Sequence, residues 1–253
     1  MIDGIHSFYS RSEEYKIPFP HPGGWSLDLE ACKFLCALIH HCKLSCILEF
    51  GSGFSSSIMA YELEKHHVGT IDSIDNSNYW SAQAANLSLK YNLGHRIQFH
   101  VLKLTLKKKK YYGHIFYDIN NNFFSKELKY DLVVVDAPHH DLGRDGAIYQ
   151  TIDKLPVGSY FFVHDTNSDH MKATIQRWQE HYPTSISVMK FNDIGNGVSL
   201  IRKEQYSDHE PVFSIRHFTI GWIRTIRNYK RLKYLSDTSS CLANYNKIIR
   251  IDG

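Results

Sequence analysis

The sequence lacks the long apolar run of a membrane span and has no signal-peptide core near its first residue. It also lacks a strong charge of either sign. The formal charge of +3 at pH 7 does not by itself argue for a nucleic-acid partner, and none is expected. The sequence therefore predicts a cytoplasmic protein with no membrane span.

The five cysteines are an odd number, which argues against a complete disulfide framework. Cys32, Cys36, Cys42 and Cys46 are crowded together, but their spacing is not that of a zinc ribbon or a common iron–sulfur run. We interpret them as small core residues in a reducing compartment.

The stretch from Cys46 to Ser57 carries the main signal in the sequence. A short apolar run predicts a buried strand, and the glycines and serines after it predict a tight turn that opens a helix. Gly51 and Gly53 let backbone N–H groups approach a ligand at the positive end of that helix. The third glycine of the dinucleotide fingerprint is missing, because Ser56 stands in its place.

A second apolar strand runs from Val68 to Asp75. It ends in an acid about 20 residues beyond the turn, where a carboxylate can bind the two hydroxyls of a ribose. This spacing makes a nucleotide-like cofactor the best interpretation of the turn.

Further elements alternate along the chain. Strands are predicted at 97–102, 132–136 and 160–163, and helices at 26–41, 55–65, 77–91 and after Asn167. Ser185 to Phe191 and Gly197 to Arg202 flank a turn and predict a β-hairpin. Lys107 to Lys110 is interpreted as a solvated loop. The pattern predicts an α/β fold with a doubly wound, mostly parallel sheet closed by an antiparallel hairpin.

The order Glu49-x-Gly51-x-Gly53-x-Ser55 resembles motif I of the class I S-adenosylmethionine-dependent methyltransferases, with the last glycine replaced. The resemblance covers about residues 25–203. It implies a Rossmann-like sheet of seven strands, S-adenosylmethionine as cofactor, and O-methylation of a small hydroxylated acceptor such as a sugar or glycan precursor. It divides the chain into an arm (1–25), a methyltransferase domain (26–203) and a basic, helical extension (204–253).

The resemblance also implies roles for residues. The cofactor would be bound by Glu49, Gly51, Ser52, Gly53, Ser55, Asp75, Asn76 and Asp136. His139, three residues after Asp136, would take the proton of the acceptor hydroxyl, as in some sugar O-methyltransferases. Trp25, before the first helix, could cover the cofactor.

A bound metal ion is an alternative way to help the acceptor hydroxyl lose its proton. Asp136 and Asp165 end neighbouring strands, and with His164 they could hold Mg²⁺, which lowers the pKa of a bound hydroxyl. The metal-dependent families carry a further acid or amide directly beside the second acid, whereas Asp165 has His164 and Thr166 as neighbours.

Other functions and partners stay open on the sequence. The turn and the ribose acid would also serve an NAD(P)-dependent oxidoreductase, and the basic tail would suit a non-catalytic binding module. In the tail, Phe218, Trp222, Ile226 and Tyr229 could share one helical face. That face could pack on its own domain, on a second subunit of a homo-oligomer, or on a membrane surface.

Overall fold

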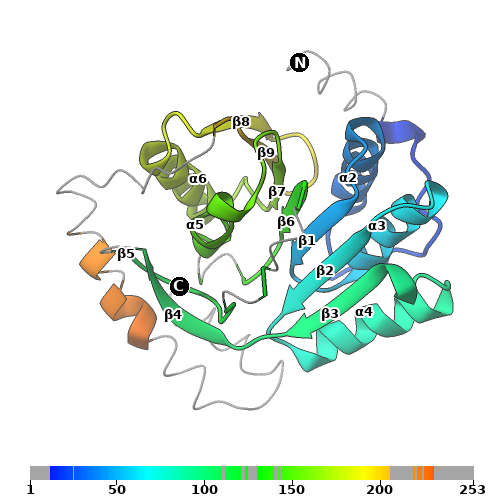
Figure 1. Ribbon diagram of the computed structural model, residues 1–253, viewed down its shortest axis with the longest axis horizontal. Coiled ribbons are helices and arrows are strands. Elements are labelled where there is room, and N and C mark those ends of the chain that lie inside the picture. The colour runs from blue at the N-terminus through cyan, green and yellow to red at the C-terminus, as the bar shows by residue number, and fades with distance from the viewer. Residues whose placement is uncertain are drawn as a thin grey trace.

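The computed structural model describes residues 12–24, 26–109, 112–120, 123–124, 130–139, 142, 144–205, 219, 221–223 and 225–230. Its centre is a seven-stranded sheet with the strand order β3-β2-β1-β6-β7-β9-β8 (Figure 1). The strands are β1 (Cys46–Phe50), β2 (Thr70–Asp75), β3 (Ile97–Val101), β6 (Leu132–Val135), β7 (Tyr160–His164), β8 (Ile186–Phe191) and β9 (Val198–Lys203). The first five are parallel, and β9 runs antiparallel to both β7 and β8. The predicted sheet and its closing hairpin are confirmed.

Apolar runs become the central strands because both faces of the sheet are covered. All four residues of β6 are buried, and successive residues of β1 enter different cores, Ile47 one and Leu48 the other. In β1 and β6 the parallel register sets Ile47 beside Leu132. This burial on two sides holds the carboxyl ends of the strands at one rigid edge.

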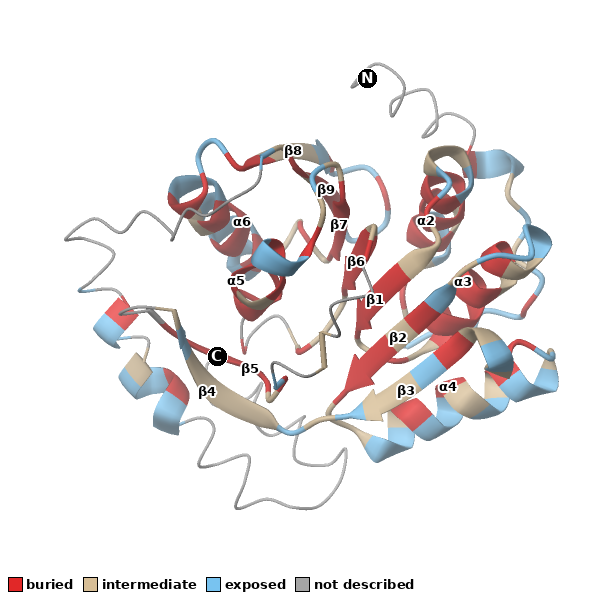
Figure 2. Ribbon diagram, viewed as in Figure 1, coloured by how far each residue is buried: buried red, intermediate tan, exposed pale blue. Residues whose placement is uncertain are grey.

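Helices form a layer on each face of the sheet (Figure 2). One layer contains α2 (Leu29–Cys42), α3 (Phe54–Lys65) and α4 (Asn78–Lys90), and the other contains α5 (Gly146–Thr151) and α6 (Asp169–His181). Short 3-10 turns lie at η1 (Ser12–Glu14), η2 (Gly94–Arg96) and η4 (Ile152–Lys154). Asp28, Ser77 and Ser168 cap the starts of α2, α4 and α6 with their side-chain oxygens.

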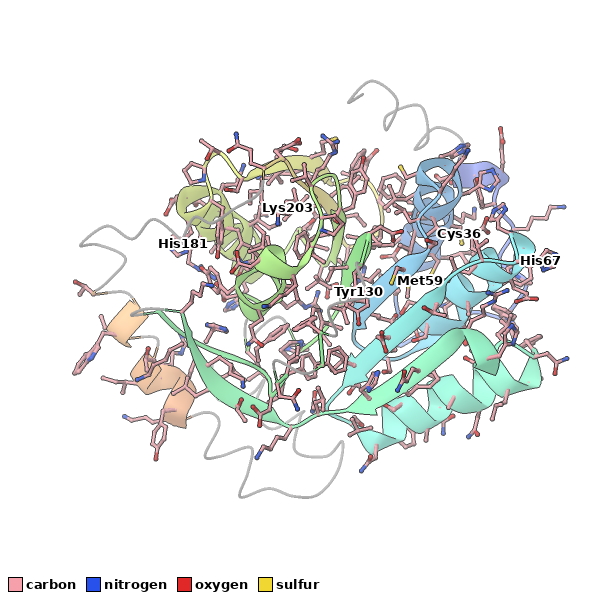
Figure 3. The ribbon with its side chains drawn as sticks, viewed as in Figure 1. Cys36, Met59, His67, Tyr130, His181 and Lys203 are labelled. Atoms are coloured by element: carbon pink, nitrogen blue, oxygen red, sulfur yellow. The ribbon has the colours of Figure 1, made fainter. Side chains whose placement is uncertain are left out.

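The layer of α2 and α3 contains the predicted core cysteines. Cys32 and Cys36 are buried, and burial raises the pKa of both thiols. Cys36 and Met59 are labelled there in Figure 3. Cys32, Cys36, Cys42 and Cys46 are free thiols, as expected.

A two-stranded antiparallel hairpin follows β3 where the sequence predicted a loop. It pairs β4 (Leu104–Lys109) with β5 (Tyr112–Tyr117), so the prediction of a solvated lysine loop is wrong for Lys107 to Lys109. The lysines pair with acids at the surface: Lys107 with Asp118 at 2.5 Å and Lys109 with Asp153 at 3.2 Å. β5 instead contributes Phe116 and Tyr117, which are both buried, to the second core.

The segments on either side of the domain both contact it. Phe19 of the arm is buried, with its ring centre 4.3 Å from that of Tyr91. In the tail, residues 221–223 and 225–230 are helical, and the Asn228 amide donates to the carbonyl of Gly113 at 3.4 Å.

The predicted apolar face of the tail does not enter the core. Trp222, Ile226 and Tyr229 are exposed, and Phe218 lies outside the described residues. Contact of this face with a membrane or a second subunit stays a prediction. No helix among the described residues is both long and apolar enough to cross a bilayer.

Candidate active site

The turn after β1 lies against the loop after β6. Gly51 has a φ of 111°, its N–H donates to the carbonyl of Ile74 at 2.8 Å, and a Cβ would lie 2.9 Å from that of Ala137. Glycine is therefore required there by both conformation and space. A Cβ at Gly53 would meet nothing within 4 Å, so the backbone at the start of α3 faces open space. A ligand can approach the N-terminus of α3 at that point.

Glu49 lies beneath the turn and is completely buried. Its carboxylate accepts hydrogen bonds from Ser55 at 2.5 Å, from Ser73 at 2.6 Å and from Ser56. Burial raises the pKa of Glu49 to about 7, although the serine hydroxyls oppose that rise. Ser55 and Ser56, which follow the glycines, thus fix the turn through their hydrogen bonds to Glu49.

Asp75 connects the end of β2 to the same turn. One carboxylate oxygen accepts the N–H of Ser52 at 3.0 Å, and the other accepts the N–H of Ser77 at 2.7 Å. Burial raises the pKa of Asp75 to about 6, against the effect of these backbone donors. Asn76 follows it and is half-buried. The predicted ribose acid and the glycine turn therefore lie side by side.

A cluster of five charged side chains lies at the carboxyl ends of β6 and β7, four of them from these strands and the segments after them and the fifth, Asp28, from the start of α2. Arg144 is buried and donates from Nη2 to Asp165 at 3.0 Å and to Asp136 at 3.4 Å. It also donates to the backbone carbonyls of Pro138, at 3.0 Å, of His164, at 2.9 Å, and of Asp136. One guanidinium thus connects the loop after β6 to the loop after β7.

His164 lies between three carboxylates. Its Nδ1 lies 2.9 Å from Asp136 and 3.4 Å from Asp165, and its Nε2 lies 2.8 Å from Asp28, the cap of α2. Burial alone would lower the pKa of His164, but Asp136, Asp28 and Asp165 outweigh it and raise the pKa to about 10. The imidazole is therefore charged at neutral pH and is not available as a general base.

The same cluster was the predicted metal site. Ligand atoms of Asp136, His164 and Asp165 lie within 4.8 Å of one another, close enough to surround an ion. However, both carboxylates already pair with the Arg144 guanidinium, a fixed positive charge at the place where a cation would bind. Mg²⁺ also prefers oxygen ligands in a nearly octahedral array. As arranged, these residues do not fit a resident magnesium ion.

His139 occupies the loop that the cluster holds in place. It follows Pro138, is half-buried, and accepts the N–H of Leu142 at its carbonyl at 2.9 Å. Its position at the carboxyl end of β6, near Asp136 in the chain, is the one expected from the sequence. Trp25, His140 and Asp141 lie outside the described residues.

Sequence reasoning missed two members of the cluster, Asp28 and Arg144. Asp28 did carry a signal, because an Asp directly before an apolar helical period is a common N-cap. Its second carboxylate oxygen also accepts the N–H of Asn196 at 3.3 Å, which ties α2 to the turn between β8 and β9. Arg144 carried no signal in the sequence that separated it from a surface arginine.

No protein-family model matches the chain, and no curated protein matches its sequence. Solved structures do match its fold. A Podospora anserina methyltransferase bound to S-adenosylhomocysteine is 17% identical, with a TM-score of 0.56 over 80% of this chain and 88% of that one. An O-methyltransferase of Streptomyces achromogenes involved in tomaymycin synthesis, solved with S-adenosylmethionine, is 16% identical, with a TM-score of 0.55 over 79% and 89%. An O-methyltransferase of Bacillus cereus with S-adenosylhomocysteine is 13% identical, with a TM-score of 0.53 over 80% and 91%.

At these identities the likeness concerns the fold. The strand order, the antiparallel β9 and the turn after β1 all agree with the Rossmann-like α/β architecture that the sequence predicted. The chain has the fold of class I S-adenosylmethionine-dependent methyltransferases.

Proposed function

We propose that the protein transfers a methyl group from S-adenosylmethionine to a hydroxyl of a small acceptor, such as a sugar or glycan precursor. One observation carries the proposal. The buried carboxylate of Asp75 lies beside an open glycine turn, at the sheet edge where α/β proteins bind nucleotides. Three structures of similar fold were solved with S-adenosylmethionine or S-adenosylhomocysteine, which supports the same cofactor here.

In this proposal the cofactor lies across the turn. The backbone at Gly51, Ser52 and Gly53 meets its methionine end, Asp75 accepts from the ribose hydroxyls, and Asn76 lies near the adenine. Glu49 and Ser55 contribute by shaping the turn, since both are buried beneath it.

Methyl transfer from a sulfonium mainly requires the two reactants to be held in line. The acceptor hydroxyl must also lose its proton, and His139 is the residue we assign to that step. Asp136 contributes by holding His164 and Arg144, which keep the loop of His139 in place. The reaction proposed here needs no metal ion.

Calorimetry with S-adenosylhomocysteine tests the cofactor. We expect wild-type protein to bind it and Asp75→Asn to bind it about 10- to 100-fold more weakly, because a charged hydrogen-bond acceptor is lost. Asp72→Asn is the matched control: its carboxylate is on the same strand but bonds to His100 and Tyr130. Binding of NAD instead of S-adenosylhomocysteine would point to an oxidoreductase and would refute the proposal.

Transfer of a radiolabelled methyl group to a panel of hydroxylated acceptors tests the reaction. We expect His139→Ala to lower turnover by about 10²- to 10⁴-fold without weakening S-adenosylhomocysteine binding. A chelator should leave turnover unchanged, and a requirement for Mg²⁺ would show that the ion displaces Arg144. Cofactor binding without transfer to any acceptor would favour a binding module.

A further inference from the structure

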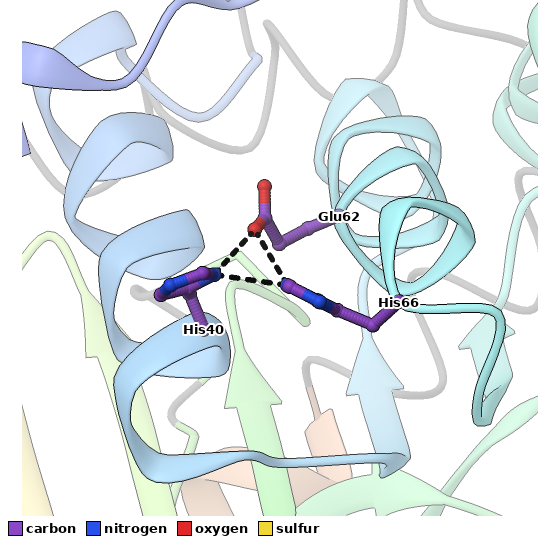
Figure 4. Close-up of side chains that lie close together, drawn as sticks. All are labelled: His40, Glu62 and His66. Atoms are coloured by element: carbon purple, nitrogen blue, oxygen red, sulfur yellow. Dashed lines mark hydrogen bonds and ion pairs between the residues drawn. The ribbon is translucent and has the colours of Figure 1, made fainter.

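A second cluster of potential ligands lies on the outside of α2 and α3, away from the candidate active site. His40 lies in the last turn of α2, Glu62 in the last turn of α3, and His66 is the residue that ends α3. Their side chains point toward one another across the gap between the two helices (Figure 4). The cluster is independent of the cofactor and of the proposed function.

Three ligand atoms form a small triangle there. Nδ1 of His40 lies 2.9 Å from Nε2 of His66, and Oε1 of Glu62 lies 3.5 Å from the first and 3.4 Å from the second. Two neutral imidazoles that face each other share only one proton, and the contacts to Oε1 are long for hydrogen bonds. The Glu62 carboxylate is nevertheless only 1% exposed. Within the triangle, Oε1 of Glu62 therefore has only these two long contacts, although the side chain of Glu62 is buried.

The triangle has the dimensions of one face of a tetrahedral metal site. In a tetrahedron the ligand atoms are separated by about 1.6 times the bond length, so bonds of about 2.0–2.1 Å set them about 3.3–3.4 Å apart. The three separations of 2.9, 3.4 and 3.5 Å bracket that value. We propose that His40, Glu62 and His66 bind a divalent transition metal ion of the zinc class, with water as the fourth ligand.

The surroundings favour a cation at this point. Both α2 and α3 end here, so the negative ends of two helix dipoles face the triangle. Lys65 donates to the other oxygen of Glu62 at 2.7 Å, which orients the carboxylate and leaves Oε1 for the metal. The imidazoles are 43% and 40% exposed, so the fourth position is open to water. Two imidazoles and one carboxylate are a ligand set that suits zinc.

The metal would stabilise the domain. α2 begins beside His164 and α3 begins at the glycine turn, so the ion would clamp the opposite ends of two helices that border the candidate active site. Removal of the metal is expected to lower stability and leave the geometry of the turn in place.

Calorimetric titration of the metal-free, full-length protein with ZnCl₂ tests this proposal. We expect one ion bound at this site, with the midpoint of thermal unfolding raised by about 5–10 °C at zinc a hundredfold above its dissociation constant. Loss of a residue that only hydrogen-bonds a metal ligand weakens metal binding by roughly 10- to 100-fold. His40→Gln and His66→Gln each remove a ligand itself, so each should weaken zinc binding by more than that. Both imidazoles are partly exposed, so the variants should fold.

His67→Gln is the matched control, because His67 is next to His66 in the chain but its side chain points outward (Figure 3). Its Nδ1 lies 3.9 Å from Oε1 of Glu64, which is not part of the triangle. It should bind zinc like the wild type. Titration in an Asp165→Asn background separates this site from the cluster at the strand ends. Co²⁺ should give the visible absorption of a four-coordinate ion, lost in His66→Gln. Absence of binding, or equal binding by wild type and His66→Gln, would refute the proposal.

Discussion

Glu49 and His164 both retain protons in the folded protein that they would release when it unfolds. Burial raises the pKa of Glu49 to about 7 and so favours the neutral acid. At His164 the three carboxylates outweigh burial and raise the pKa to about 10, which favours the charged imidazole. In both cases the folded state binds more protons than the unfolded state, so stability falls as the pH rises through the window of each residue.

The His164 window lies between pH 6.5, the ordinary pKa of histidine, and about 10. The contribution of His164 is fully present below pH 6.5 and is lost by pH 10. We expect this loss to be roughly 2–5 kcal/mol of unfolding free energy. Urea unfolding at a series of pH values measures it.

In that series His164→Gln should flatten the decline, whereas His95→Gln, an exposed histidine beside Glu64, should keep it. The same slope in His164→Gln and wild type would mean that the charge of His164 does not support the fold.

At the scale of elements, Arg144 connects two loops that the sheet alone does not tie together. β6 and β7 are neighbours in the sheet, and the guanidinium joins the loops after them through its bonds to Pro138, His164 and Asp165. The contact of His164 with Asp136 is a second link between the two strand ends. Removing one partner of a buried ion pair leaves the other charges uncompensated.

We therefore expect Arg144→Met to lower the unfolding free energy by about 3–5 kcal/mol, as measured by urea unfolding at neutral pH. Arg202→Met is the control, since Arg202 pairs with Glu204 near the surface and its loss should cost about 0–1 kcal/mol. Equal effects of the two substitutions would contradict the role assigned to Arg144.

The elements also show what the sequence could and could not predict. Runs such as Leu132 to Val135 predicted central strands because burial on both faces demands apolar residues at every position. β4 was missed because three of its six residues are consecutive lysines, a composition that resembles that of a loop. The place of Asp75 beside the turn followed from its spacing along the chain, and its role in binding a ribose stays a prediction. Arg144 and Asp28 were missed, because their contacts with His164 arise from folding across 20 and 136 positions of the chain.

For the whole molecule, the last strand found among the described residues is β9, which ends at Lys203. β9 lies between β7 and β8, and among the described residues the buried members of both cores end at Ile201. In the described part of the tail, Gly221 and Asn228 are the buried residues. The end of the domain near residue 203 stays a prediction.

A protein truncated after Glu204 should therefore fold. We expect S-adenosylhomocysteine affinity within about threefold of the full chain, and a thermal midpoint lower by about 2–8 °C, since about 1–2 kcal/mol of packing on the hairpin is lost. Calorimetry and thermal unfolding measure the two quantities. An insoluble or unfolded truncated protein would place the tail within the domain.

The five ionic groups at the ends of β6 and β7 also carry a net charge. Asp28, Asp136 and Asp165 contribute three negative charges and His164 and Arg144 two positive ones, which leaves −1. A sulfonium ion is attracted to such a field, whereas the thioether that remains after methyl transfer is neutral. Under the proposed reaction, the cluster would therefore favour binding of S-adenosylmethionine over S-adenosylhomocysteine. The product would then dissociate more easily, which weakens product inhibition.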